Sequence, residues 1–164
     1  MSSLRQFLLL YLFFNTACVS IDIPKNELRK SSNYSFVQPN EDDFKVADSK
    51  ELDHLWVHKE NGNSISILSD CSTSYDPSLQ QLKNGITSGI NNLQTKSSNY
   101  KTYNKRKALF THIQGDVDGV MSEFDLVIFK KNGCVYTLTH VATKNSYSIT
   151  KDSFNKFVSN FKVD

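Results

Sequence analysis

The sequence predicts an α+β domain in which an antiparallel sheet of about five to six strands packs against two helices. Two runs rich in β-forming residues flank the pair Asn61-Gly62, and residues 76–96 carry apolar side chains at helical spacing. The C-terminal half alternates apolar and polar residues before it ends in a second helical pattern. When a sheet and two helices each have one apolar face, packing them on one another as a sandwich buries those faces.

The N-terminal segment is predicted to direct export. Arg5 precedes the apolar run Phe7–Phe14, and small residues follow that run, which is the arrangement of a secretory signal peptide. The run is too short for a membrane span, because crossing the hydrocarbon core takes about 20 mainly apolar residues. Residues 1–17 are therefore predicted to be a signal peptide.

The four residues "NTAC" at positions 15–18 resemble the bacterial lipobox, in which a peptidase cuts before a cysteine that then receives lipid. This resemblance implies that Cys18 is lipidated, and that acyl chains such as palmitate hold the mature protein at a membrane. Ordinary signal cleavage after Ala17 or Ser20 is the main alternative, and an uncleaved anchor is the third. Val19 follows Cys18, which favours the outer membrane or a periplasm-facing membrane surface in the cell envelope.

After the signal, the chain is predicted to form one tether and one domain. Residues 18–42 are mostly polar and lack a sustained apolar period, so we expect a flexible tether there and a single domain over residues 43–164. Within Asp53–Ser69, Asn61-Gly62 predicts a β-hairpin, because this pair tolerates the positive φ angles of a tight turn.

The first helix is predicted to begin at Asp76 and Pro77, since Asp can cap a helix and Pro suits the first helical position. An apolar stripe follows at intervals of three and four residues: Leu79, Leu82, Ile86, Ile90 and Leu93. Gly85 and Gly89 are costly inside a helix, so they are interpreted as points of close packing on a sheet.

Three strands are predicted next, over Ala108–Gln114, Glu123–Lys130 and Cys134–Ala142. The turn-forming pairs Asp118-Gly119 and Asn132-Gly133 connect them. A final helix is predicted from the spacing of four apolar residues, with Thr150 or Asp152 as its N-cap. Those residues are Phe154, Phe157, Val158 and Phe161.

This order of hairpin, helix, three-stranded meander and helix resembles the PsbP-like fold, which includes small bacterial lipoproteins of the DcrB type. The stretches that carry the resemblance are "DPSLQQLKNGI", "RKALFTHIQGDVDGVMSEFDLVIFKKNGCVYTLTHVA" and "FNKFVSNF". The resemblance covers roughly residues 43–161. It implies a PsbP-like sandwich and a binding or assembly factor instead of an enzyme.

The composition excludes a typical nucleic-acid-binding protein. The formal net charge is only +2, whereas such proteins normally show a strong basic excess. Besides Cys18, the chain contains Cys71 and Cys134. In an exported protein these two can form a disulfide, or they can remain half-buried thiols.

One segment, residues 96–107, concentrates basic side chains and contains no acid. The basic residues are Lys96, Lys101, Lys105, Arg106 and Lys107, interleaved with Tyr100 and Tyr103. They are candidates for contact with an anionic surface, where each basic residue near a membrane contributes about 1 kcal/mol. An acidic partner or a glycan could be contacted equally well. The expected structure of the segment is a solvated, mobile loop, with ligand contact as the alternative.

The histidines are weak candidates for a metal site. His54 and His58 share one strand face with Trp56, but no third ligand is evident nearby. His112 and His140 lie on predicted strands of one meander and could approach each other or His54. The acidic run at residues 115–125 departs from the calcium-loop pattern, so we expect a simple turn there.

No nucleophile elbow, zinc-protease, P-loop or dinucleotide motif is present. We therefore expect no cofactor, no metal and no catalytic residue. The sequence predicts a membrane-anchored, non-enzymatic envelope lipoprotein that binds or helps assemble another envelope component. The expected partner is a protein of the envelope. The alternative is a secreted small-ligand-binding or hydrolytic domain with a cleft lined by His54, His112 or His140.

Overall fold

The computed structural model of the protein describes residues 29–72 and 76–164. The helices are α1 (Leu79–Ile86) and α2 (Tyr147–Asn160). The strands are β1 (Tyr34–Ser35), β2 (Phe44–Val46), β3 (His54–His58), β4 (Ser64–Asp70), β5 (Asn91–Tyr103), β6 (Arg106–Val117), β7 (Val120–Lys131), β8 (Cys134–Thr143) and β9 (Lys162–Val163). In this part of the chain, neither helix has the length and apolar character needed to cross a membrane.

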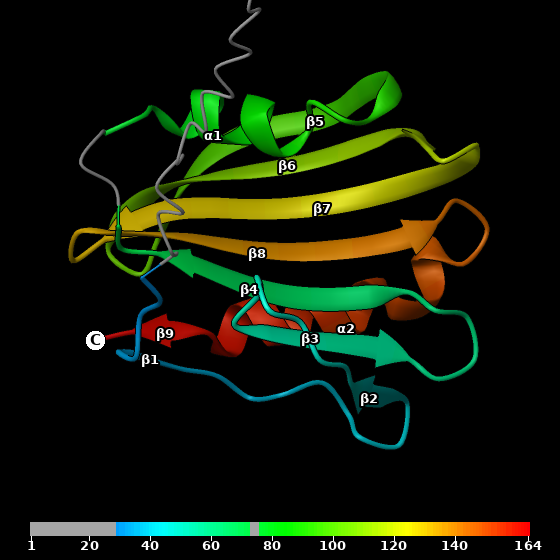
Figure 1. The fold of residues 1–164 in the computed structure, drawn as a ribbon, viewed down its shortest axis with the longest axis horizontal. Coiled ribbons are helices and arrows are strands. Elements are labelled where there is room, and N and C mark those ends of the chain that lie inside the picture. The colour runs from blue at the N-terminus through cyan, green and yellow to red at the C-terminus, as the bar shows by residue number, and fades with distance from the viewer. Residues whose placement is uncertain (1–28, 73–75) are drawn as a thin grey trace, which may run out of the picture.

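The strands form a seven-stranded antiparallel sheet in the order β2-β3-β4-β8-β7-β6-β5, with β1 and β9 paired separately (Figure 1). The α+β class and the two helices are confirmed. The expected strand number of five to six is wrong, because the short strand β2 and the long strand β5 extend the sheet at its two edges.

The two helices cover opposite faces of the sheet, and adjacent strand residues point to opposite faces. On one face, Leu79 and Leu82 of α1 pack against a cluster made of Ile113, Phe124, Leu126, Ile128 and Val135. On the other face, α2 contributes Phe154 and Phe157 to the larger core, which also holds Trp56, Phe129, Tyr136, Leu138 and Phe161. In Figure 1, α1 lies in front of the sheet and α2 behind it.

Helix α1 is shorter than the sequence predicts. Ser78 caps it, and Gln81 completes a reciprocal capping box, so Asp76 is not the cap. The helix ends at Ile86, and the chain then enters β5 at Asn91. The interpretation of Gly85 and Gly89 as close packing points is wrong, because an added Cβ at either position would meet open space.

The predicted helix does not continue to Ile90 and Leu93, because the chain turns back onto the sheet after α1. Ile90 packs on the α1 face beside β6, where a side chain at Gly115 would come within 2.4 Å of Ile90 Cγ2. Gly115 therefore permits this close approach. Along β5 almost every residue is exposed, so the strand lacks the apolar alternation by which strands are predicted. This accounts for the missed strand.

Helix α2 begins at Tyr147, and its N-cap Ser146 makes no side-chain capping bond. The prediction of Thr150 or Asp152 as cap is wrong. Instead, the Ser146 hydroxyl donates to Oδ1 of Asn63 at 2.6 Å, which fastens the helix start to the β3–β4 hairpin. The turns predicted at Asn61-Gly62, Asp118-Gly119 and Asn132-Gly133 are confirmed, with positive φ at each glycine.

The predicted signal peptide and Cys18 lie outside the described residues, as does the first part of the predicted tether. The part of the tether that the structure describes, residues 29–42, differs from a free linker. Tyr34 pairs with Val163, and the Phe36 ring meets that of Trp56 at a centroid distance of 5.3 Å. The folded body therefore extends N-terminal to residue 43.

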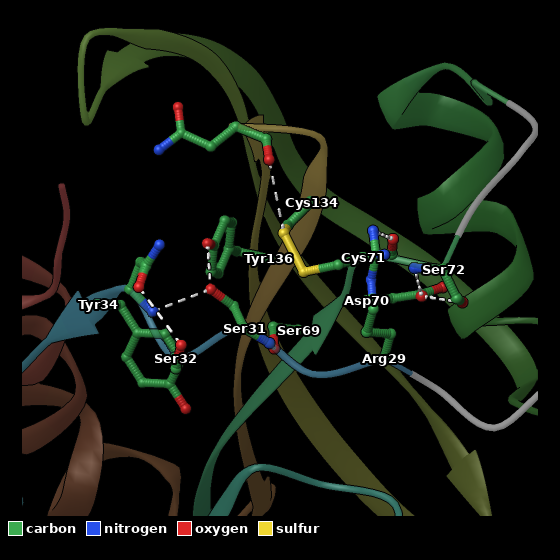
Figure 2. Close-up of a disulfide and its surroundings, with 12 residues drawn as sticks. Arg29, Ser31, Ser32, Tyr34, Ser69, Asp70, Cys71, Ser72, Cys134 and Tyr136 are labelled. Atoms are coloured by element: carbon green, nitrogen blue, oxygen red, sulfur yellow. Dashed lines mark hydrogen bonds between the residues drawn. A yellow bond between two sulfur atoms is a disulfide. The ribbon is translucent and has the colours of Figure 1, made fainter.

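Cys71 and Cys134 form a disulfide, as the first of the two alternatives predicts. The bond joins the end of β4 to the start of β8, two strands that are already neighbours in the sheet. Ser31 lies beside it, with its amide donating to Ser69 Oγ at 2.8 Å and its hydroxyl 2.8 Å from that of Tyr136 (Figure 2). The disulfide thus stands where the N-terminal segment joins the sheet.

Replacing both cysteines, Cys71→Ser with Cys134→Ser, should lower the free energy of unfolding by roughly 4 kcal/mol for a loop of this length. The physical reason is that the bond restricts an unfolded chain over a separation of 63 residues. Urea denaturation measures the change. Reduction of the unaltered protein should produce the same loss and should leave the double variant unaffected; an unchanged midpoint after reduction contradicts a stabilising bond.

Candidate functional site

Three polar side chains form a row across the middle of the sheet, on the face that α2 covers. Register pairs His112 of β6 with Asp125 of β7, and Asp125 with His140 of β8. Directly opposite residues of antiparallel strands lie side by side on one face. The two histidines that the sequence suggested could approach each other therefore meet at Asp125, whereas His54 does not join them.

The Asp125 carboxylate is surrounded by donors. Nδ1 of His140 lies 3.1 Å from Oδ2, and Nδ1 of His112 lies 3.1 Å from Oδ1. From α2, the Lys151 ammonium donates to Oδ1 at 2.7 Å and the Tyr147 hydroxyl donates to Oδ2 at 3.0 Å. Lys151 also donates to the Tyr147 oxygen. The carboxylate thus binds the helix to two neighbouring strands of the sheet.

Burial and bonding act on the ionisation of Asp125 in opposite directions. Desolvation alone would raise the pKa of this carboxyl, but bonds from His140 and Lys151, together with the Lys151 charge, lower its pKa to about 2. For Tyr147, burial first and the nearby Asp125 charge second raise the pKa of the phenol. Asp125 is therefore an anion at neutral pH, and Tyr147 is a neutral donor to it.

Behind Asp125, a hydrogen-bond chain runs into the core. Nε2 of His140 lies 2.8 Å from the Thr150 hydroxyl, which accepts a bond from Nδ2 of Asn63 at 2.8 Å. With Nδ1–H of His140 donating to the carboxylate, Nε2 accepts from Thr150, and every group is satisfied. This order of acid, imidazole and hydroxyl matches a nucleophilic triad, but His140 and Thr150 are both 0% exposed.

His112 lies at the exposed end of the row. Its Nε2 faces Oε2 of Glu123 at 3.1 Å, while Nδ1 faces Asp125. The side chain of His112 is 22% exposed, so it stands at the boundary between the buried network and solvent. Among the described residues, no group of three or more His, Cys, Asp or Glu side chains is placed to hold a metal ion.

Beside this row lies a surface cavity of about 230 Å³, here named the β5–α2 groove. One wall comes from β5, the floor from β6 and β7, and the other wall from α2. The lining residues are Ser97, Asn99, Lys101, Phe110, Thr111, His112, Asp125, Leu126, Val127, Lys151, Phe154, Asn155 and Val158. The groove forms because α2 packs over β8 and leaves the edge strand β5 uncovered.

The groove presents polar groups that the fold itself does not use. No hydrogen bond to another described residue engages the side chains of Ser97, Asn99 or Asn155. The Lys101 ammonium lies 5.1 Å from the centre of the Phe110 ring, within cation–π range. Asp125 is the one acidic residue in the lining, and its charge is already matched by Lys151. The groove therefore offers free donors, a net positive charge and an aromatic floor.

The structure divides the predicted basic cluster between different places. Lys101 lines the groove, whereas Lys105 stands in the turn of the β5–β6 hairpin, followed by Arg106 and Lys107 at the start of β6. Lys96 lies at an irregularity in the β5–β6 register, outside the groove. The expectation of a mobile loop over residues 96–107 is wrong, since two paired strands and a tight turn occupy it.

The remaining histidine candidates pack as structural aromatics. The His54 ring stacks on Trp56 at 5.4 Å between centroids, and His58 meets Phe44 edge-on at 5.1 Å. Sequence reasoning missed Asp125, Tyr147 and Lys151 as members of one site. The available signal was that Asp125 is the one charged residue in the apolar run 124–129, where strand alternation places it on the face opposite Phe124 and Leu126.

Comparison with solved structures shows a PsbP-like fold. The chain resembles a protein described as LpqN, involved in cell envelope biogenesis of Mycobacterium tuberculosis, at a TM-score of 0.61 and 12% identity, over 82% of this chain and 87% of that one. It also resembles the cyanobacterial PsbP of Synechocystis at a TM-score of 0.50 and 11% identity, over 82% and 95% of the two chains. No protein-family model and no curated protein sequence matches the chain.

Asp125→Asn should lower the free energy of unfolding at pH 7 by about 2 kcal/mol, because the charged acceptor is lost. The pKa of Asp125 is about 2 in the folded protein and close to 4 in an unfolded chain. The carboxylate therefore stabilises the fold above pH 4, and this contribution is lost as the pH falls through that window.

The measurement is urea denaturation of both proteins at pH 7 and near pH 2.5. We expect the difference between them to shrink at the lower pH. Asp152→Asn, which alters an exposed acid on the same helix, is the control and should change little at either pH. A difference that stays the same at both pH values contradicts the charge network.

Proposed function

We propose that this protein is a lipid-anchored, non-enzymatic component of the bacterial cell envelope, and that it binds an acidic segment of a protein partner in the β5–α2 groove. The observation that carries the proposal is the pairing in the groove of free polar groups with positive charge. The side chains of Ser97, Asn99 and Asn155 have no hydrogen-bond partner within the described residues. The one acid in the lining, Asp125, is paired with Lys151 and not with Lys101. Such groups suit carboxylates of a ligand.

The same geometry supports binding over catalysis. A general base needs a free acceptor and a nucleophile needs access to substrate. Asp125 accepts bonds from four side chains, and the imidazole and hydroxyl behind it are fully buried. The network therefore acts as a structural support for one end of the groove, while the ligand-facing groups are two side-chain amides, one hydroxyl and the Lys101 ammonium.

The envelope part of the proposal rests on the leader, the disulfide and a structural neighbour. The lipobox-like residues 15–18 supply an anchor at Cys18, and the disulfide between Cys71 and Cys134 suits an oxidising compartment. The LpqN structure, whose description names cell envelope biogenesis, has the same fold. A shared fold hosts many functions, so the role of this chain is argued from its groove and its leader.

A small-molecule ligand is the alternative function. The observation in its favour is that His112 lines the groove, as the hypothesis of a histidine-lined cleft requires. A cavity of about 230 Å³ is below the size of ligand pockets, which typically run from about 300 to 1,000 Å³. The groove is also open along β5, and a segment of a partner fits such a shape better than an enclosed small molecule.

Partner binding is tested by cross-linking and pull-down from envelope membranes with Lys101→Glu. This change reverses the charge in the groove, so recovery of a specific partner should fall about tenfold, equivalent to about 1.4 kcal/mol. Lys96→Glu makes the same change on the same strand outside the groove and should retain binding. Equal losses from both variants, or from neither, contradict the groove as the binding site.

The anchor is tested by mass spectrometry of the mature N-terminus. We expect a chain that begins at Cys18 and carries the mass of acyl groups. Cys18→Ser should abolish that mass and release the protein from membranes after cell lysis. A mature chain that begins after Ala17 or Ser20 without added lipid contradicts the anchor.

A further inference from the structure

We infer that the tip of the β5–β6 hairpin is a contact surface for anionic phospholipid headgroups and sets how the anchored domain lies on its membrane. The tip is defined here as Lys105, Arg106 and Lys107. None of the three lines the β5–α2 groove, so this surface is separate from the proposed binding site. The inference rests on the proposed anchor at Cys18.

The described chain enters the fold at the disulfide. The Cys71 amide donates to the Arg29 carbonyl at 2.8 Å, and the Arg29 guanidinium donates to the Cys71 carbonyl at 2.6 Å (Figure 2). Cys134, the other half of the disulfide, follows the β7–β8 turn. In that turn, Asn132 donates to the carbonyl of Asp164 at 2.6 Å. Chain entry, turn and C-terminus therefore lie together.

The hairpin tip joins the same end of the molecule through Asn104. Its side-chain amide donates to the Phe161 carbonyl at 3.2 Å, and its Oδ1 accepts from the Val163 amide at 2.9 Å. These two bonds hold the hairpin turn against β9, which Figure 1 shows at the end of the sheet where the C-terminus lies. The first described residue, Arg29, thus lies at the end that presents the basic tip.

Charge is segregated along the sheet, although the net charge is only +2. Residues 77–115 contain no Asp or Glu, and Lys105, Arg106, Lys107 and the neighbouring Lys162 are exposed. The acids Asp70, Asp76 and Asp164 also lie at this end, and Asp76 is paired with Lys130.

The opposite end holds the β3–β4 and β6–β7 turns. The basic residues Lys45, Lys59 and Lys144 lie at that end, but acidic residues outnumber them there. The acidic residues are Glu41, Asp42, Asp43, Glu60, Asp116 and Asp118.

The tether keeps the basic end within reach of the bilayer. From Cys18 to Arg29 a fully extended chain spans at most about 40 Å, and attraction between basic residues and anionic lipids acts within a Debye length of about 8–10 Å. Tyr100 adds an interfacial side chain, because it is 51% exposed and the Lys107 ammonium lies 4.0 Å from its ring centre. Aromatic rings of this kind favour the headgroup region.

The experiment uses the full lipidated protein in vesicles of phosphatidylcholine, with and without phosphatidylglycerol. Flotation reports the anchor, and hydrogen exchange with mass spectrometry reports contact. We expect amides of residues 100–108 to exchange about tenfold more slowly with phosphatidylglycerol at low salt, and this protection to disappear at high salt. Residues 116–121, at the opposite end, should exchange alike in both vesicles.

The triple variant Lys105→Glu, Arg106→Glu and Lys107→Glu should lose the protection while it still floats. The matched control, Lys45→Glu with Lys144→Glu and Lys156→Glu, changes the net charge equally and should keep it. Flotation with no lipid-dependent protection of the tip overturns the inference alone, as does an equal loss in both triple variants. Failure to float with either vesicle overturns the anchor, and the orientation with it.

Discussion

The carboxylate of Asp125 joins helix α2 to the face of the sheet that this helix covers. It accepts bonds from His112 and His140 on neighbouring strands and from Tyr147 and Lys151 on α2. A buried carboxylate without such donors would be costly, so the helix start, the β6–β7–β8 row and the anion depend on one another. The register that places the three row residues opposite one another makes this arrangement possible.

That network also determines what the groove can do. Lys151 and both histidines are directed at Asp125, so the negative charge at the end of the groove is balanced. The polar side chains of the groove that have no hydrogen-bond or ion-pair partner among the described residues are those of Ser97, Asn99, Lys101 and Asn155. The fold thereby places a charge-matched support beside a positively charged groove. The basic tip of the β5–β6 hairpin is a second surface, separate from the groove. Successive residues of a strand face opposite sides of the sheet, and the tip lies at the turn where β5 ends.

The elements with a buried face were predictable, because burial leaves an apolar pattern in the sequence. The meander β6–β8, the Asn61-Gly62 hairpin and the aromatic stripe of α2 all show it. Strand β5 could not be found in this way, since it has no buried face, and Ile90 continued the spacing of α1 by coincidence. Part of the site was predictable, because the sequence suggested that His112 and His140 could approach each other. Only the strand register shows that Asp125 lies between them.

Binding of carboxylates in the β5–α2 groove can be followed by backbone NMR while the folded protein is titrated with a tetraglutamate peptide. Binding in the groove should produce saturable shifts confined to Ser97, Asn99, Lys101 and Asn155, which a tetraserine peptide does not produce. Shifts centred on Lys105–Lys107 instead, or no saturable change at all, would contradict it.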